Sequence, residues 1–201
     1  MIAHAALWLF ASTITVLAAV ARARSAAVSY ARPTVVTLLA GALAVIVIGD
    51  ERGSPMSLGM APAMACAIVC AASDLATGLI FDSVTASAAL MILLTALAVG
   101  SVPATAVGAC VCAGSLLALY ALTRGRGIGL GDVKLGAVIG AGCGGAGAIG
   151  AIGTAFVAGA LWAVPLLVRK RVHPGDRVVF APFLALGTIA SLGMRLLSAH
   201  G

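Results

Sequence analysis

Two aspartates are conspicuous because the chain has so few charged residues. Only 9% of its 201 residues are charged, whereas about a quarter are charged in ordinary soluble domains. Asp74 begins the segment Asp74-Leu-Ala-Thr-Gly-Leu-Ile-Phe-Asp82, and Asp132 lies in Gly129-Leu-Gly-Asp-Val-Lys134. An acid beside an apolar segment costs free energy, so such a residue is a functional candidate by default. Two carboxylates held together share one proton, which predicts general acid–base chemistry.

The segments that must position these acids are strongly apolar. Hydrophobic residues make up 62% of the chain, and the mean hydropathy is +1.18. This composition excludes a soluble fold and predicts an all-α polytopic membrane protein, with residues 1–201 forming one domain in the lipid bilayer. The net charge of +6 does not indicate nucleic-acid binding, because no basic face is interleaved with aromatic residues.

Apolar runs divided by charges or by glycine and proline predict about eight transmembrane helices. The expected spans are Ala5–Val20, Thr34–Gly49, Leu58–Ser73, Ser83–Val102, Ala104–Leu122, Leu135–Gly147, Ile149–Val168 and Val178–Leu197. The stretch from Leu135 to Val168 is too long for one span. We therefore expect a tight hairpin near Gly144-Gly145.

The distribution of basic residues predicts the orientation. Arg22 and Arg24 follow the first apolar run rather than precede it, which argues against a cleaved signal peptide and places the N-terminus outside. Alternation over eight spans then leaves ten of the twelve Lys and Arg residues in the cytoplasm, with Arg52 and Arg195 outside. The C-terminus also falls outside. The same alternation puts Asp74 and Asp132 at cytoplasmic helix ends, so the two acids are expected to meet.

The motifs resemble those of the type IV prepilin peptidase family, the GxGD membrane aspartyl proteases. That family has an Asp, then Ile-Pro-Asp or Ile-Pro-Asn, then GxGDxK, then a segment similar to Phe180-Ala-Pro-Phe-Leu-Ala-Leu-Gly187. The resemblance covers most of the chain in matching order. Departures occur where Phe81 replaces the usual proline and where Val179 and Ala181 replace parts of Pro-Phe-Gly.

The resemblance implies an aspartyl endopeptidase of the bacterial plasma membrane, with Asp74 and Asp132 as its catalytic pair. Its implied partners are prepilins or pseudopilins, whose basic leaders are cut at the cytoplasmic face. Larger family members carry a cysteine-rich insert linked with methylation of the product. The corresponding loop, Ala21–Pro33, is short and has no cysteine. We therefore expect a peptidase without a metal or another cofactor.

Several residues near the acids have two interpretations each. Asp132 is either catalytic or the N-cap of its helix, and Asp82 is favoured as a cap of the fourth span over a supporting role at the site. Lys134 either tunes Asp132 or holds substrate, or it is an interfacial cation that follows the orientation rule.

The glycines and Pro182 are assigned supporting or structural roles. Gly127, Gly129 and Gly131 either provide unusual backbone conformations and close approach at the site, or form a plain flexible loop. Gly136, Gly140 and Gly144 form a stripe that predicts helix packing. Pro182 is expected in the first turn of the last helix, and the resemblance implies a place for it in the active-site wall. The five cysteines lie in apolar runs and are interpreted as small hydrophobic residues.

Two other functions are compatible with the composition. A small proton-coupled transporter would use the acids as a relay, but it requires acids at graded depths. A non-enzymatic scaffold for pilus assembly would tolerate the loss of either acid. The client pilin and the oligomeric state are not indicated by the residues.

Overall fold

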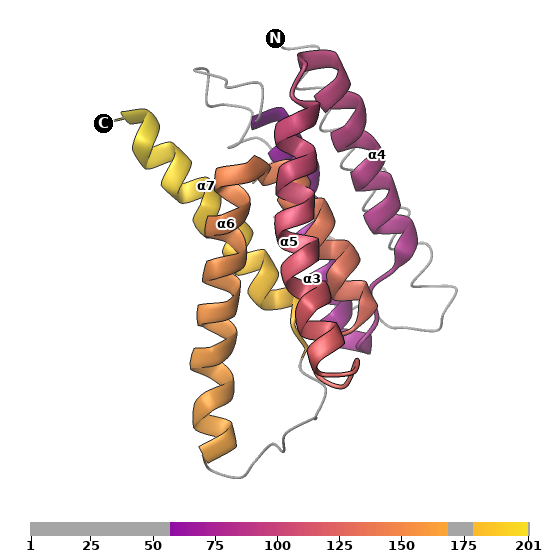
Figure 1. Ribbon diagram of the computed structural model, residues 1–201, viewed down its shortest axis with the longest axis vertical. Helices are drawn as coiled ribbons and strands as arrows, with labels where there is room; N and C mark the ends of the chain where they lie inside the picture. The colour runs from indigo at the N-terminus through magenta and orange to yellow at the C-terminus, as the bar shows by residue number, and fades with distance from the viewer. Residues whose placement is uncertain (1–56, 169–178, 201) are drawn as a thin grey trace.

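The computed structural model describes residues 57–168 and 179–200, and the regular structure of these residues is entirely helical (Figure 1). The all-α prediction is therefore confirmed for this part of the chain. The expected spans Ala5–Val20 and Thr34–Gly49 lie outside the described residues. The helices are α3 (Ser57–Thr77), α4 (Asp82–Val99), α5 (Val102–Leu122), α6 (Leu130–Val168) and α7 (Ala181–His200).

Three stretches of the described helices are long and apolar enough to cross a membrane: Asp82–Val99, Val102–Leu122 and Leu130–Pro165. In α3 the apolar stretch, Gly59–Leu75, is shorter. Large apolar side chains cover the outside of α4, where Leu90, Leu94 and Leu97 are all more than half exposed. Such a surface suits lipid rather than water. The count of eight spans and the location of the termini stay predictions.

The fourth expected span is too long at its C-terminal end. Helix α4 ends at Val99 because Gly100 adopts a left-handed conformation with φ 70°, and the next helix already includes Val102. Glycine reaches this conformation without a Cβ penalty and commonly terminates helices. Pro103 then lies in the first turn of α5, where its missing N–H costs nothing. These local signals give a tight connection between the two helices.

Helix α6 contains the predicted reversal, and it lies at Gly144. This residue has φ 67° and ψ 175°, which no α-helix accommodates. Before the bend, Gly142 lies against Gly59 near the start of α3. After it, Gly147 lies beside Arg195, and Gly159 lies beside Phe180 at the other end of α7. The two halves of α6 therefore run in opposite directions (Figure 1), without an intervening loop.

Side chains from the neighbouring helices bind carbonyl groups around this bend. The Arg195 guanidinium donates to the Cys143 carbonyl, and the Ser191 hydroxyl donates to the Gly147 carbonyl at 3.1 Å. The Cys112 thiol donates to the Ala148 carbonyl at 3.5 Å. A helix broken inside a bilayer needs such donors because lipid supplies none. Arg195, which the orientation count leaves outside, thus has a structural partner at the bend.

Helices α5 and α6 meet through glycine backbones. A Cβ atom on Gly140 would overlap the Gly108 carbonyl, and one on Gly136 would overlap the Leu116 side chain. The predicted packing face is therefore confirmed at Gly136 and Gly140, and Gly144, which forms the bend, also lies against Gly108 of α5. Small residues permit this approach, and in lipid such contact rather than the hydrophobic effect holds helices together. The contact carries the start of α6 to its place beside α3 and α4.

We expect Gly140→Ala to destabilise the protein, because the added methyl group must separate α5 from α6. Overpacking of this kind costs about 1–3 kcal/mol. Gly153→Ala, in the same helix, is the matched control, because its Cβ would meet no atom within 4 Å. Thermal unfolding in detergent measures both variants. Equal melting temperatures for the two would contradict the proposed close contact.

Candidate active site

Asp74 lies in the last turn of α3, where the helix is closed by glycine. Gly78 has φ 67°, and its N–H donates to the Asp74 carbonyl at 2.8 Å. The Asp74 side chain is only 8% exposed. Its Oδ2 atom accepts the N–H of Ala181, the first residue of α7, at 3.3 Å. A negative charge is unfavourable at the C-terminus of its own helix, but the N-terminus of α7 offsets this.

Asp132 occupies the third position of α6 and is 7% exposed. Its Oδ2 atom accepts the N–H of Gly129 at 3.0 Å, while the Gly129 carbonyl begins the helical hydrogen bonds. Gly129 is therefore the N-cap, and Asp132 supplies the carboxylate that reaches back to it, as in a capping box. The N-cap interpretation of Asp132 is wrong by three residues. The Oδ1 atom of the same carboxylate is also buried.

The structure brings the two aspartates to one cavity of about 480 Å³. This acidic cavity lies where the end of α3, the start of α4 and the start of α6 converge, at the lower end of the bundle in Figure 1. Its volume is in the range of small-molecule and peptide side-chain sites. The lining residues are Asp74, Thr77, Gly78, Leu79, Ile80, Asp82, Gly129, Leu130, Gly131, Asp132 and Val179.

Gly131 allows the two motif segments to touch. A Cβ atom on this residue would lie 3.1 Å from the Ile80 Cβ, which is tighter than an ordinary contact. Gly129 and Gly131 are not among the glycines with positive φ. The expected close approach is therefore present at Gly131. The expected left-handed backbone conformation is present at neither Gly129 nor Gly131. The small residue places Ile80, and with it the α3–α4 connection, against the start of α6.

The structure corrects the prediction that Asp82 caps α4. Phe81 is the N-cap, without a side-chain hydrogen bond, and Asp82 is the first residue inside the helix. Its carboxylate binds a side chain of another helix instead. Both of its oxygens accept hydrogen bonds from Lys134 Nζ, at 2.8 and 2.9 Å. Lys134 thus binds the third acid of the cavity.

The start of α7 is anchored by aromatic packing. The Phe180 ring lies 5.7 Å from that of Phe156 and 5.9 Å from that of Phe183, and Trp162 contacts Phe183. Pro182 lies in the first turn, as predicted. Of this segment, Val179 lines the acidic cavity and Pro182 does not. Sequence reasoning missed the Ala181 N–H at Asp74, because a backbone donor leaves no side-chain pattern.

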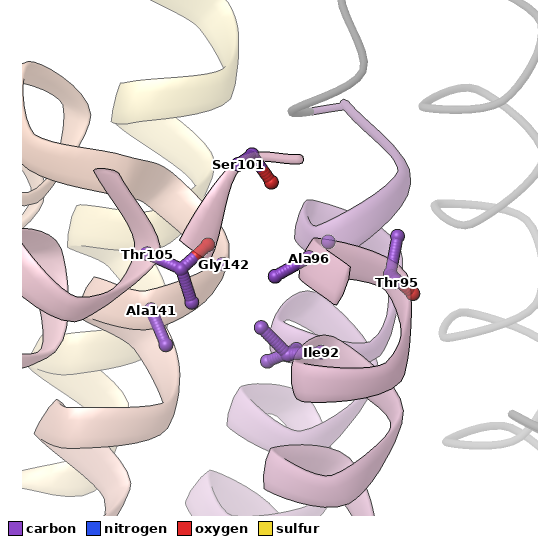
Figure 2. Close-up of a pocket in the computed structure, with 8 residues that line it drawn as sticks. Ile92, Thr95, Ala96, Ser101, Thr105, Ala141 and Gly142 are labelled. Carbon is purple, nitrogen blue, oxygen red and sulfur yellow. The ribbon is translucent and has the colours of Figure 1, made fainter. Parts of the chain in front are cut away.

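A second cavity lies at the opposite end of α4, and its residues come from four helices (Figure 2). It measures about 10 Å³, which is about the space of one water molecule. Ile92, Ala96, Thr105 and Gly142 are among its lining residues. No carboxylate lines it, so of these two cavities we take the acidic one as the candidate active site.

We expect Gly131→Val to loosen the contact between the α3–α4 connection and α6, because its side chain needs the space of Ile80. Amide hydrogen exchange of residues 78–81 should become faster. Gly127→Val is the matched control, since its Cβ would make only ordinary contacts of 3.6–3.8 Å with Thr123. Unchanged exchange in residues 78–81 of the Gly131 variant would show that the contact does not hold the segment.

Comparison with known proteins assigns the chain that carries this site to a family. Residues 61–164 match the model of the type IV leader peptidase family, and this stretch is just over half of the chain. It includes both aspartates of the acidic cavity, whereas α7 lies beyond it. Comparisons with curated proteins and with solved structures gave no match. From the extent of the match, this chain belongs to the type IV leader peptidase family.

Proposed function

We propose that this protein is an aspartyl endopeptidase that removes basic leaders from type IV prepilins or pseudopilins at the cytoplasmic face of a bacterial plasma membrane. Family membership supports a membrane protease in general. One observation carries the specific proposal: Asp74 and Asp132, from different helices, are both buried and line the same cavity. Asp74 and Asp132 are proposed as the catalytic residues.

The proposed chemistry follows from the shared environment of the two acids. Two neighbouring carboxylates cannot both ionise cheaply, so the pair holds one proton. The ionised carboxylate takes a proton from water as the water oxygen attacks the peptide carbonyl. The protonated carboxylate donates its proton to the carbonyl oxygen, and a proton then passes to the leaving amine as the C–N bond breaks.

The volume and lining of the cavity fit a short stretch of extended polypeptide. Leu79, Ile80, Leu130 and Val179 provide apolar wall beside the carboxylates. A helix cannot expose its backbone carbonyls to the acids, because they are bound to N–H groups within the helix. The substrate therefore has to unwind locally before cleavage. The apolar wall can receive side chains released in this way.

The positions of the acids count against a proton relay. Asp74, Asp82 and Asp132 all line one cavity at one end of the bundle, whereas a relay needs carriers at graded depths across the bilayer. A scaffold without enzymatic activity would have no need for two buried carboxylates. Together with the excess of basic residues on the predicted cytoplasmic side, this favours a protease that acts at the cytoplasmic face.

We expect Asp74→Asn and Asp132→Asn each to abolish leader removal. Loss of a general acid or base lowers the rate by about 10²–10⁴-fold, and an amide cannot share the proton. The measurement is cleavage of a purified prepilin by the protein in detergent, followed by mass spectrometry, with thermal unfolding to show that both variants fold. Full processing by either folded variant would refute the two-aspartate mechanism.

We also expect the N–H of Ala181 to position Asp74. Ala181→Pro removes this donor at a helix start that tolerates proline, whereas Ala181→Gly keeps it. Turnover by the proline variant should fall about tenfold at unchanged KM, because a misaligned carboxylate weakens the transition state more than the bound substrate. Similar kcat values for the two variants would show that this hydrogen bond has no part in catalysis.

A further inference from the structure

The Asp82–Lys134 ion pair is accessible, unlike the two buried aspartates. The Asp82 side chain is 71% exposed and the Lys134 side chain 52% exposed. Asp82 lines the acidic cavity, and Lys134 is not among its lining residues. The Asp82 carboxylate also has no capping role in α4. The structure therefore places an exposed anion at the wall of the candidate active site, with a cation of the protein itself bound to it.

This ion pair is exchangeable on physical grounds. Exposed pairs contribute little to stability, because water competes for both charges and two long side chains lose freedom. A second cation that reaches the carboxylate can therefore replace Lys134 at small cost. A lysine ammonium would make the same contacts as Lys134. An arginine guanidinium would bind the two carboxylate oxygens through two separate N–H groups, which is a stronger arrangement.

The location of Asp82 links it to the buried acids. Ile80, two residues before it, contacts Gly131, and Gly131 is the neighbour of Asp132 in the chain. A cation bound at Asp82 therefore lies in the same cavity as the proposed scissile bond. Arg124 and Arg126 are exposed on the α5–α6 connection and do not line this cavity. The Asp82 carboxylate at the cavity is therefore not paired with either of these arginines.

We propose that Asp82 is a cation subsite, which binds a lysine or arginine side chain of the substrate close to the bond that is cut. Lys134 occupies the subsite in the absence of substrate and competes with the substrate cation. This inference rests on the proposed peptidase function and deepens it, since it assigns one charged group of the leader to one residue of the protein. It also gives the two members of the ion pair opposite effects on substrate preference.

The experiment compares cleavage of matched substrates by the full-length protein in phosphatidylcholine vesicles, whose uncharged surface does not attract the leader. Each substrate is a short leader followed by an apolar helix, and the members of a series differ only by Lys, Gln or Glu at one leader position. The readout is the ratio of kcat/KM for the Lys substrate to that for the Gln substrate, and each leader position is tested in turn.

At the position that contacts the subsite, we expect Asp82→Asn to lower this ratio about tenfold, as for loss of one charge-assisted contact. Lys134→Met should raise the ratio, because the competing cation is gone. The double variant Asp82→Lys/Lys134→Asp keeps an ion pair but reverses its direction. It should therefore prefer the Glu substrate over the Lys substrate.

A purely structural ion pair gives a different result. Both single variants would then lower kcat/KM for the Lys and Gln substrates by the same factor, and the reversed pair would restore it. That outcome, or a ratio unchanged by Asp82→Asn at every leader position, overturns the subsite. Failure of the proposed function is distinguishable, because the wild-type protein would then cleave no member of the series.

Discussion

The site depends on one physical constraint: a carboxylate can be buried at the end of an apolar bundle only if a donor meets it. Asp74 accepts the first N–H of α7, and Asp132 accepts the N–H that precedes its own helix. Both donors belong to helix N-termini, where unpaired N–H groups and the helix dipole favour negative charge. Through these two hydrogen bonds, backbone N–H groups at the starts of α6 and α7 hold the carboxylates of α6 and α3 at the acidic cavity. Loss of either N–H donor would leave a buried carboxylate without that hydrogen bond.

Glycine makes this convergence possible at two levels. Gly140 and Gly108 bring the backbones of α6 and α5 together, and Gly131 admits Ile80 to the first turn of α6. At the far end of the bundle, Gly144 reverses α6, so its second half can run along α7. Arg195 binds this bend from α7. The same helix therefore contacts the bend near one end and Asp74 at the other.

The three aspartates that the structure describes have different environments, and these suit them to different roles. Asp74 and Asp132 are buried against backbone donors and share a cavity, which suits proton transfer. Asp82 lines the same cavity but is exposed and bound to Lys134, which suits reversible recognition of charge. The proposed division between chemistry and recognition follows from burial and from the partner that each carboxylate binds. It needs no difference in the intrinsic properties of the carboxyl groups.

The sequence by itself determined the features that depend on neighbouring residues. Apolar runs predicted the described helices, and Gly144-Gly145 predicted the reversal of α6; the resemblance of the motif segments indicated the family. Local hydropathy and glycine placement are enough for these, because they act on the backbone within a few residues. Only the tertiary structure decided which groups meet: Asp82 binds Lys134 instead of capping α4, and Ala181 donates to Asp74. Such partners depend on how distant helices pack, and no local pattern records that arrangement.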